Sequence, residues 1–317
     1  MLSTIEKLPL TSNPSILANS LESQIGNTPL LHLRKTAVSY NIPDTIQLFA
    51  KAEWFNPSGS VKDRAALNVI LTAEENGQLK PGMTLLDSTS GNMGIAYAMI
   101  GAARGYKVKL TLPSNASPER IAILKAYGAD LTFTDPLEGS DGAIMEARKL
   151  ATADPSLYYA NQYNNSANWQ AHYKSTAVEI WEQTKGQITH YVAGLGTSGT
   201  FTGTTKRLRE FNPNIRAIAM QPDSPFHGLE GLKHMPSAIK PGIYNEELAD
   251  ENIVVRTEDA YEMARFLARE EGIFVGISAA AAVMATVQVA RTLSEGVIAT
   301  VLPDNGFKYL SDKLWDL

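Results

Sequence analysis

Short apolar segments alternate with longer segments of helical periodicity along this chain. The apolar segments are 46–54, 84–89, 107–113, 130–135, 189–196, 215–222 and 297–303, and the helical ones are 63–77, 95–105, 117–129, 142–152, 201–211, 259–272 and 279–293. This repeated order predicts an α/β fold of mostly parallel sheets with flanking helices. Single cores rarely grow past about 250 to 300 residues, so a chain of 317 residues is expected to form two domains.

Composition excludes several classes of protein. The 28 basic residues are outnumbered by 33 acidic ones, so no nucleic-acid partner is expected. The absence of cysteine excludes disulfides, thiolate metal sites and a Cys nucleophile. No metal is expected either, because the histidines lack metal-site spacing and are predicted at the surface or in loops. They are His32, His172, His190, His227 and His234.

No apolar run approaches the ~20 residues of a membrane span. The first twenty residues also lack the basic start and long apolar core of a signal peptide. These two features predict a cytoplasmic protein with no membrane partner.

Three loops of small residues carry the candidate chemistry. They are NPSGSVKDR at 56–64, STSGNMG at 88–94 and GLGTSGT at 194–200. Each glycine loop follows a predicted strand and precedes a helix, which is where open α/β sheets bind ligands. Lys62 lies at such a loop-to-helix junction, where a desolvated amine can act as nucleophile and base. We therefore interpret the three loops as one active site.

The loop 194–200 suits a phosphate. Its glycines allow close approach of the backbone, the following helix favours negative charge, and Thr197, Ser198 and Thr200 add hydroxyl donors. The same spacing satisfies GxGxxG, and Asp223 follows at about the distance of a ribose-binding acid. A nicotinamide dinucleotide-binding dehydrogenase is thus an alternative, although it leaves Lys62 and Asn92 without a role. A catalytically silent interaction protein is another.

Six segments, in order, resemble the cysteine synthases and their β-replacement relatives. The segments are NPSGSVKDR, STSGNMGIA, NQYNNSAN, GLGTSGTFTG, EGIFVGISAAAAV and LPDNGFKYLS. The similarity runs from about residue 26 to 312. It implies the tryptophan synthase β-like fold type II, pyridoxal 5'-phosphate as cofactor and a homodimer. It also implies a larger cofactor-phosphate-binding domain, 1–56 with 163–317, and a smaller mobile substrate-binding domain, 57–162.

The resemblance assigns roles to individual residues. Lys62 would bind the cofactor covalently and move the substrate's α-proton. Asn92 would bond the phenolic oxygen of the cofactor ring, and Ser278 would contact the pyridine nitrogen. The cofactor's phosphate would be held by Gly196, Thr197, Ser198, Gly199 and Thr200.

The substrate's α-carboxylate is assigned to the second loop and one distant residue. The group comprises Thr89, Ser90, Asn92, Met93 and Gln162. Met93 departs from the family's usual threonine, and SANWQAHY at 166–173 departs from a more usual NPAN-like stretch. Both departures resemble relatives that join O-phosphoserine to an amino-acid nitrogen to make diaminopropionate precursors.

Lys233 bears on the choice of donor, because the similar O-phosphoserine-dependent enzymes carry an arginine there. A cation at this position is expected to pair with the donor's phosphate. The resemblance implies formation of L-cysteine from an O-activated L-serine, with O-phosphoserine favoured and O-acetylserine possible. The sulfur would come from sulfide or a sulfur-carrier protein. Alternatives are an amino-acid nitrogen nucleophile, or homocysteine as in cystathionine β-synthases.

Overall fold

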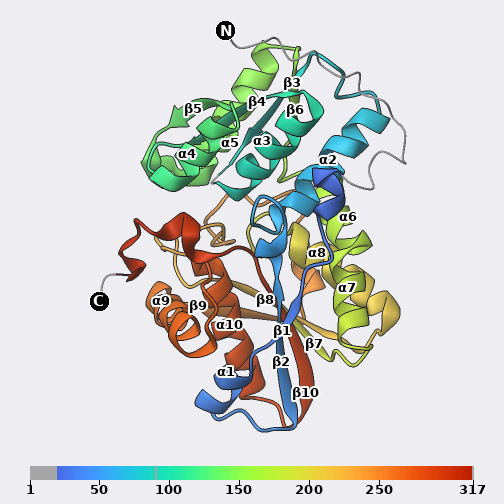
Figure 1. The fold of residues 1–317 in the computed structure, drawn as a ribbon, viewed down its shortest axis with the longest axis vertical. Coiled ribbons are helices and arrows are strands. Elements are labelled where there is room, and N and C mark those ends of the chain that lie inside the picture. Colours follow the sequence, from blue (N-terminus) through green and yellow to red (C-terminus); the bar gives the residue numbers. More distant parts are fainter. Residues whose placement is uncertain (1–19, 90, 316–317) are drawn as a thin grey trace.

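The computed structural model describes residues 20–89 and 91–315, which form two bodies that lie one above the other in Figure 1. The large body is built on a six-stranded sheet. Its strands, in spatial order, are β1 (Leu30–His32), β2 (Ile46–Ala52), β10 (Gly296–Leu302), β7 (His190–Gly194), β8 (Arg216–Pro222) and β9 (Glu251–Val255). All neighbouring strands are parallel except β1 and β2.

Helices cover both faces of this sheet. On one face lie α9 (Thr257–Phe266) and α10 (Ile277–Ala290), and on the other α7 (Thr176–Gln183) and α8 (Gly199–Phe211). Because side chains alternate along a strand, Val192 of β7 packs with the first pair and Tyr191 with the second. The large body also contains α1 (Arg34–Ser39) and α6 (Ser166–Lys174).

The small body has a parallel four-stranded sheet. Its order is β5 (Asp130–Thr134), β4 (Lys107–Pro113), β3 (Thr84–Ser88) and β6 (Leu157–Tyr159). The sheet is flanked by α3 (Asn92–Arg104), α4 (Pro118–Ala126) and α5 (Gly139–Ala153). Helix α3 ends at Gly105, whose φ of +76° is in the left-handed region that glycine adopts without strain.

Helix α2 (Lys62–Glu75) joins the two bodies, because it packs against α3 on one side and α6 on the other. Figure 1 shows it at their junction. Short 3-10 turns complete the fold at Leu21–Gln24, Glu53–Phe55, Pro136–Glu138, Glu246–Leu248, Gly306–Tyr309 and Lys313–Trp315, with a π turn at Leu267–Glu271. The domain boundaries at residues 57 and 162 stay a prediction.

The predicted α/β fold is confirmed, and every predicted apolar segment contains a strand. The strands that were not predicted are β1, β6 and β9, which all lie at sheet edges. Edge strands are short and only partly buried, so their apolar pattern is weak. Helices α1, α6 and α7 were also missed. The helix predicted at 259–272 stops at Phe266 as an α-helix and continues as a π turn to Glu271.

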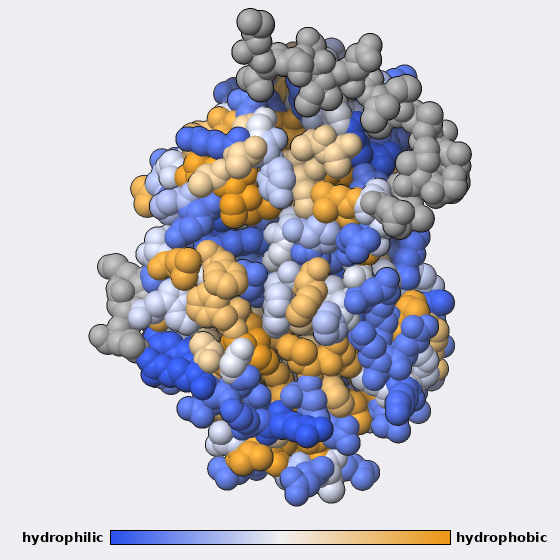
Figure 2. Space-filling view, in the orientation of Figure 1, coloured by the Kyte–Doolittle hydropathy of each residue, from blue (hydrophilic) through white to orange (hydrophobic). Residues whose placement is uncertain are grey.

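The large body has a group of hydrophobic residues on one face of its surface. Figure 2 shows hydrophobic residues gathered over the centre of this body, with hydrophilic residues on both sides of them. Among the helices of the described residues, none has the length and apolar character needed to cross a membrane.

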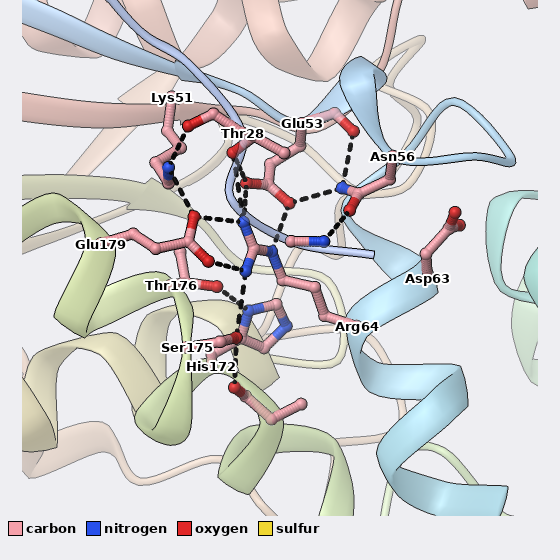
Figure 3. Close-up of polar contacts among 12 residues, drawn as sticks. Thr28, Lys51, Glu53, Asn56, Asp63, Arg64, His172, Ser175, Thr176 and Glu179 are labelled. Atoms are coloured by element: carbon pink, nitrogen blue, oxygen red, sulfur yellow. Dashed lines mark hydrogen bonds and ion pairs between the residues drawn. The ribbon is translucent and has the colours of Figure 1, made fainter. Parts of the chain in front are cut away.

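A buried ion-pair network holds the start of α2 (Figure 3). The Arg64 guanidinium donates to Glu53 at 2.7 and 2.9 Å and to Glu179 at 2.5 and 2.8 Å. Lys51 Nζ lies 2.7 Å from the same Glu179 carboxylate. Burial alone would raise the pKa of Glu179, but Arg64 and Lys51 together lower it to about 2. The network thus joins the first turn of α2 to Lys51 and Glu53, at the end of β2, and to Glu179 on α7.

We expect Arg64→Met to lower the free energy of unfolding by about 3–5 kcal/mol, because it leaves two carboxylates without their shared cation. Urea denaturation monitored by circular dichroism measures this change. Arg207→Met is the matched control, because Arg207 pairs with Glu210 on the exposed surface and its loss should change stability little. Equal stability of Arg64→Met and the unmodified protein would contradict a structural role for the network.

Candidate active site

One cavity lies where four helices begin. Its wall includes the first residues of α2, α3 and α8 and the second residue of α10, which are Lys62, Asn92, Gly199 and Ser278. The rest of the wall is formed by Val61, Ala193, Gly194, Gly196, Thr197, Ser198, Thr200, Glu230, Gly231, Leu232, Ala282, Val301 and Pro303. The structure therefore brings together all the residues that the sequence assigned to the cofactor.

Lys62 faces a desolvated environment. Just before it, the Val61 backbone N–H donates to the Pro303 carbonyl at 2.8 Å, which ties the start of α2 to the end of β10. Burial lowers the pKa of Lys62 to about 8, and the nearby Asp304 carboxylate opposes this shift. A lysine of this pKa is deprotonated at mildly alkaline pH, so its amine can act as a nucleophile and base.

The loop 196–200 is shaped to receive an anion. A methyl group added at Gly196 would overlap the Gly231 carbonyl oxygen, and one at Gly199 would overlap the Asn168 amide, so the glycines permit tight folding of the loop. Ser198 has a left-handed φ of +69° and precedes α8. Its buried hydroxyl finds no partner among the described residues. A bound anion would accept from this hydroxyl and from backbone N–H groups at the start of α8.

The prediction that His172 is a surface or loop residue is wrong. It lies on α6, and only 1 % of the residue is exposed. Its Nδ1 is 2.9 Å from the Thr176 hydroxyl, and its Nε2 is 3.2 Å from the Thr200 hydroxyl. Burial, with the charges of Arg64 and Lys62, holds the pKa of His172 well below its usual value. Its ring is therefore a neutral partner behind the anion loop.

Of the residues predicted to bind the substrate carboxylate, Asn92 lines this cavity, whereas Thr89, Met93 and Gln162 do not. The Thr89 hydroxyl accepts the backbone N–H groups of Gly91 and Gly94, at 2.9 and 3.0 Å. Gln162 donates to the Ser88 carbonyl at 2.6 Å. Met93 is buried among the apolar side chains of the small body. Ser90 lies outside the described residues, and the assignment of this group to the carboxylate stays a prediction.

Lys233 is buried between the two bodies. Its Nζ lies 2.6 Å from the Asp141 carboxylate and 3.0 Å from the Ser140 hydroxyl, both at the start of α5. Only 5 % of the residue is exposed, so Lys233 is not a solvated surface lysine. The Lys233 ammonium therefore lies at the junction of the two bodies, where it is already paired with the Asp141 carboxylate.

Sequence reasoning missed three charged residues near the cavity. Asp304 accepts from the Asn92 Nδ2 at 2.7 Å, and Lys308 donates to the Asn92 Oδ1 at 2.8 Å. Glu230 lines the cavity and pairs with Arg120 of α4. Asp304 and Lys308 both lie in the LPDNGFKYLS segment, which carries part of the family resemblance, but the resemblance assigns them no role.

A two-body α/β fold with a desolvated lysine and an anion loop in the wall of one cavity is typical of enzymes that bind a phosphorylated cofactor through a lysine. Comparison with known proteins agrees with this class. Residues 21–304 match the family described as "Pyridoxal-phosphate dependent enzyme". The chain belongs to this family, and it is a pyridoxal-phosphate-dependent enzyme.

Similar proteins include named cysteine synthases. The chain is 54 % identical over 296 residues to a cysteine synthase of Aquifex aeolicus, covering 92 % of this chain and 90 % of the relative. The crystal structure of a cysteine synthase from Entamoeba histolytica has a TM-score of 0.89 and 36 % identity, covering 98 % and 95 % of the two chains. That of an O-acetylserine-dependent cystathionine β-synthase from Helicobacter pylori has a TM-score of 0.88 and 32 % identity, covering 94 % and 98 %.

These findings confirm the predicted family, fold type and cofactor. They favour pyridoxal phosphate over the dinucleotide alternative for the loop 194–200. Asp223, which the alternative needs as a ribose-binding acid, is exposed and does not line the cavity.

We expect Ser198→Ala to weaken binding of pyridoxal phosphate about tenfold, the effect of one lost hydrogen bond to a charged group. The apoprotein should keep its melting temperature, because the Ser198 hydroxyl has no described protein partner to lose. Fluorescence titration of the apoprotein and thermal denaturation measure the two effects. Thr202→Val is the matched control, because its buried hydroxyl is also without a described partner but lies outside the cavity wall. Equal cofactor affinities of the two variants would contradict the assigned loop.

Proposed function

We propose that the protein forms L-cysteine by β-replacement on an O-activated L-serine, with sulfide as the nucleophile. The observation that carries the proposal is that the wall of one cavity includes both Lys62 and the loop 196–200. Its support is the similarity over most of the chain to enzymes named cysteine synthase. Besides the cofactor, this cavity would bind an amino-acid donor and a sulfur nucleophile.

The residues present fit pyridoxal phosphate. The unsatisfied Ser198 hydroxyl and the start of α8 would hold its phosphate, and Lys62 would hold it through the side-chain amine. Asn92 and Ser278 would bond its ring. Bound pyridoxal phosphate supplies an electron sink that stabilises negative charge at the donor's α-carbon.

Lys62 performs the proton transfer in the proposed reaction. When the donor's amine takes its place, the freed Nζ accepts the donor's α-proton. The leaving group then departs from the β-carbon with its bonding electrons, sulfide adds to that carbon, and the Lys62 Nζ returns a proton to the α-carbon. Ser278 offers a hydroxyl, and a neutral hydroxyl, unlike a carboxylate, does not force a ring nitrogen to stay protonated. This favours loss of the β-substituent over transamination.

Thr89, Ser90 and Gln162 are proposed to hold the donor's α-carboxylate. Thr89 and Gln162 organise the loop between β3 and α3 through their bonds to Gly91, Gly94 and Ser88. Binding of a carboxylate to backbone N–H groups of this loop would move the small body over the cavity and exclude water. The mobility of residues 57–162 is part of this proposal.

Two other nucleophiles are alternatives to sulfide. Homocysteine is favoured by the similarity to the Helicobacter pylori enzyme, and an amino-acid nitrogen by the departures at Met93 and 166–173. Delivery of sulfur by a carrier protein and assembly as a homodimer are proposals that rest on the resemblance to the family.

The experiment that tests the function supplies purified holoenzyme with O-acetylserine or O-phosphoserine and then with sulfide, homocysteine or diverse amino acids. Mass spectrometry identifies each product. We expect cysteine from sulfide at the highest kcat/KM. Cystathionine or an N-linked product at higher kcat/KM would replace the proposal by the corresponding alternative, and no product from any pair would contradict β-replacement.

We expect Lys62→Ala to lower turnover by at least about a thousandfold, because both the covalent attachment and the proton acceptor are removed. Release of acetate or phosphate from the donor, followed without added sulfide, measures the first half of the reaction. Lys109→Ala is the matched control, since Lys109 pairs with Asp130 on β4 and β5, outside the cavity wall. Retention of more than a tenth of the activity in Lys62→Ala would contradict the assigned base.

Lys233 decides the proposed preference for O-phosphoserine. Its buried ammonium could pair with a phosphate after exchange of the Asp141 carboxylate, whereas a neutral acetyl ester gains nothing from the charge. Lysine lacks arginine's bidentate fork, so the preference should be weaker than in the arginine-containing relatives.

We expect Lys233→Ala to raise the KM for O-phosphoserine about tenfold, the scale of one charge-assisted contact. The KM for O-acetylserine should change less. Steady-state kinetics with both donors measure this, and Lys240→Ala, which removes an exposed partner of Glu246, is the control. Equal losses with both donors, or no loss with either, would leave O-acetylserine as the proposed donor.

A further inference from the structure

The Asn92 side chain lies between two buried charges of opposite sign. Its Nδ2 donates to the Asp304 carboxylate at 2.7 Å, and its Oδ1 accepts from the Lys308 ammonium at 2.8 Å. Both charged residues follow β10, whereas Asn92 is the first residue of α3. Two segments far apart in the sequence therefore meet at one amide on the cavity wall.

These two contacts fix which end of the amide faces which neighbour. A flipped amide would place its oxygen against the carboxylate and its nitrogen against the ammonium, so both contacts would become repulsive. An amide nitrogen carries two N–H bonds, and Asp304 uses one of them. The second remains for a ligand in the cavity that Asn92 lines.

Asp304 is itself held in place. The residue is fully buried, and its Oδ2 also accepts from the Tyr309 hydroxyl at 2.9 Å. The Arg120 guanidinium lies 4.6 Å from the centre of the Tyr309 ring, on the side of the small body. The carboxylate thus has a fixed position and lies close enough to Lys62 to influence its charge.

Lys308 connects the same amide to the loop before α2. Its Nζ donates to the Gly59 carbonyl at 3.2 Å as well as to Asn92. Only 5 % of Lys308 is exposed, so removal of its charge leaves two oxygens without their donor in a desolvated place. Lys308 therefore holds Asn92 relative to the loop that leads to Lys62.

We propose that Asp304 and Lys308 are positioning residues that hold the Asn92 amide in one orientation, with its nitrogen directed to the cofactor ring. This inference rests on the proposed function only for the assignment of Asn92 to the ring. It predicts that both charged residues act on the cofactor through Asn92 and have little effect on it once that amide is removed.

A double-mutant cycle tests this coupling. The dissociation constant of pyridoxal phosphate is measured by titrating the apoproteins of Asn92→Ala, Lys308→Met, Lys308→Arg and the double variant. We expect Lys308→Met to weaken binding about tenfold in the natural background and less than about twofold in the Asn92→Ala background. Lys308→Arg keeps the cation and should recover most of the affinity. Lys109→Met, which removes a lysine from an ion pair outside the cavity wall, should change nothing in either background.

Equal weakening by Lys308→Met in both backgrounds, or no weakening in either, would overturn the inference. If Lys308→Met does not fold, Asp304→Asn takes its place in the same cycle, with the same expected loss of effect in the Asn92→Ala background. The readout is cofactor affinity, so it is independent of turnover. A protein that binds the cofactor and makes no cysteine would contradict the proposed function and leave this test intact.

Discussion

The buried guanidinium of Arg64 fixes the element on which the active site depends. It lies two residues after Lys62 in α2, and its carboxylate partners belong to two other segments, Glu53 after β2 and Glu179 on α7. The charges of Arg64, Glu53 and Glu179 neutralise one another in the protein interior. Loss of one partner there leaves an unpaired buried charge and lowers the stability of the fold. Because α2 also packs against both bodies, this network sets the position of the lysine relative to the large sheet and the small body alike.

The cavity gains a common electrostatic character from the helices around it. Four helices begin there, with Lys62, Asn92, Gly199 and Ser278 in their first turns. The start of a helix carries a partial positive charge and free N–H groups. Four such ends favour an anionic ligand before any side chain is considered. The strand-then-helix topology therefore supplies part of the affinity for a phosphorylated cofactor, and the local glycines and hydroxyls add specificity.

The sequence predicted what depends on local pattern and missed what depends on packing across the fold. Lys62 and the loop 196–200 stand in distinctive runs of small residues, so their position at strand-to-helix junctions could be inferred. His172 could not be placed, because its helix begins in a polar, asparagine-rich segment and its partners Thr176 and Thr200 lie on other helices. Asp304 gains its contact with Asn92 only when residues 212 positions apart meet.

The proposed mechanism requires that Lys62, rather than one of the more deeply buried lysines, holds the cofactor. Lys51, Lys233 and Lys308 are buried, and each has a carboxylate, carbonyl or amide oxygen as partner. Reduction of the holoenzyme with borohydride fixes the cofactor to its amine, and peptide mapping by mass spectrometry identifies that amine. The account predicts one modified peptide, containing Lys62. Modification of Lys308 or any other lysine in its place would contradict it.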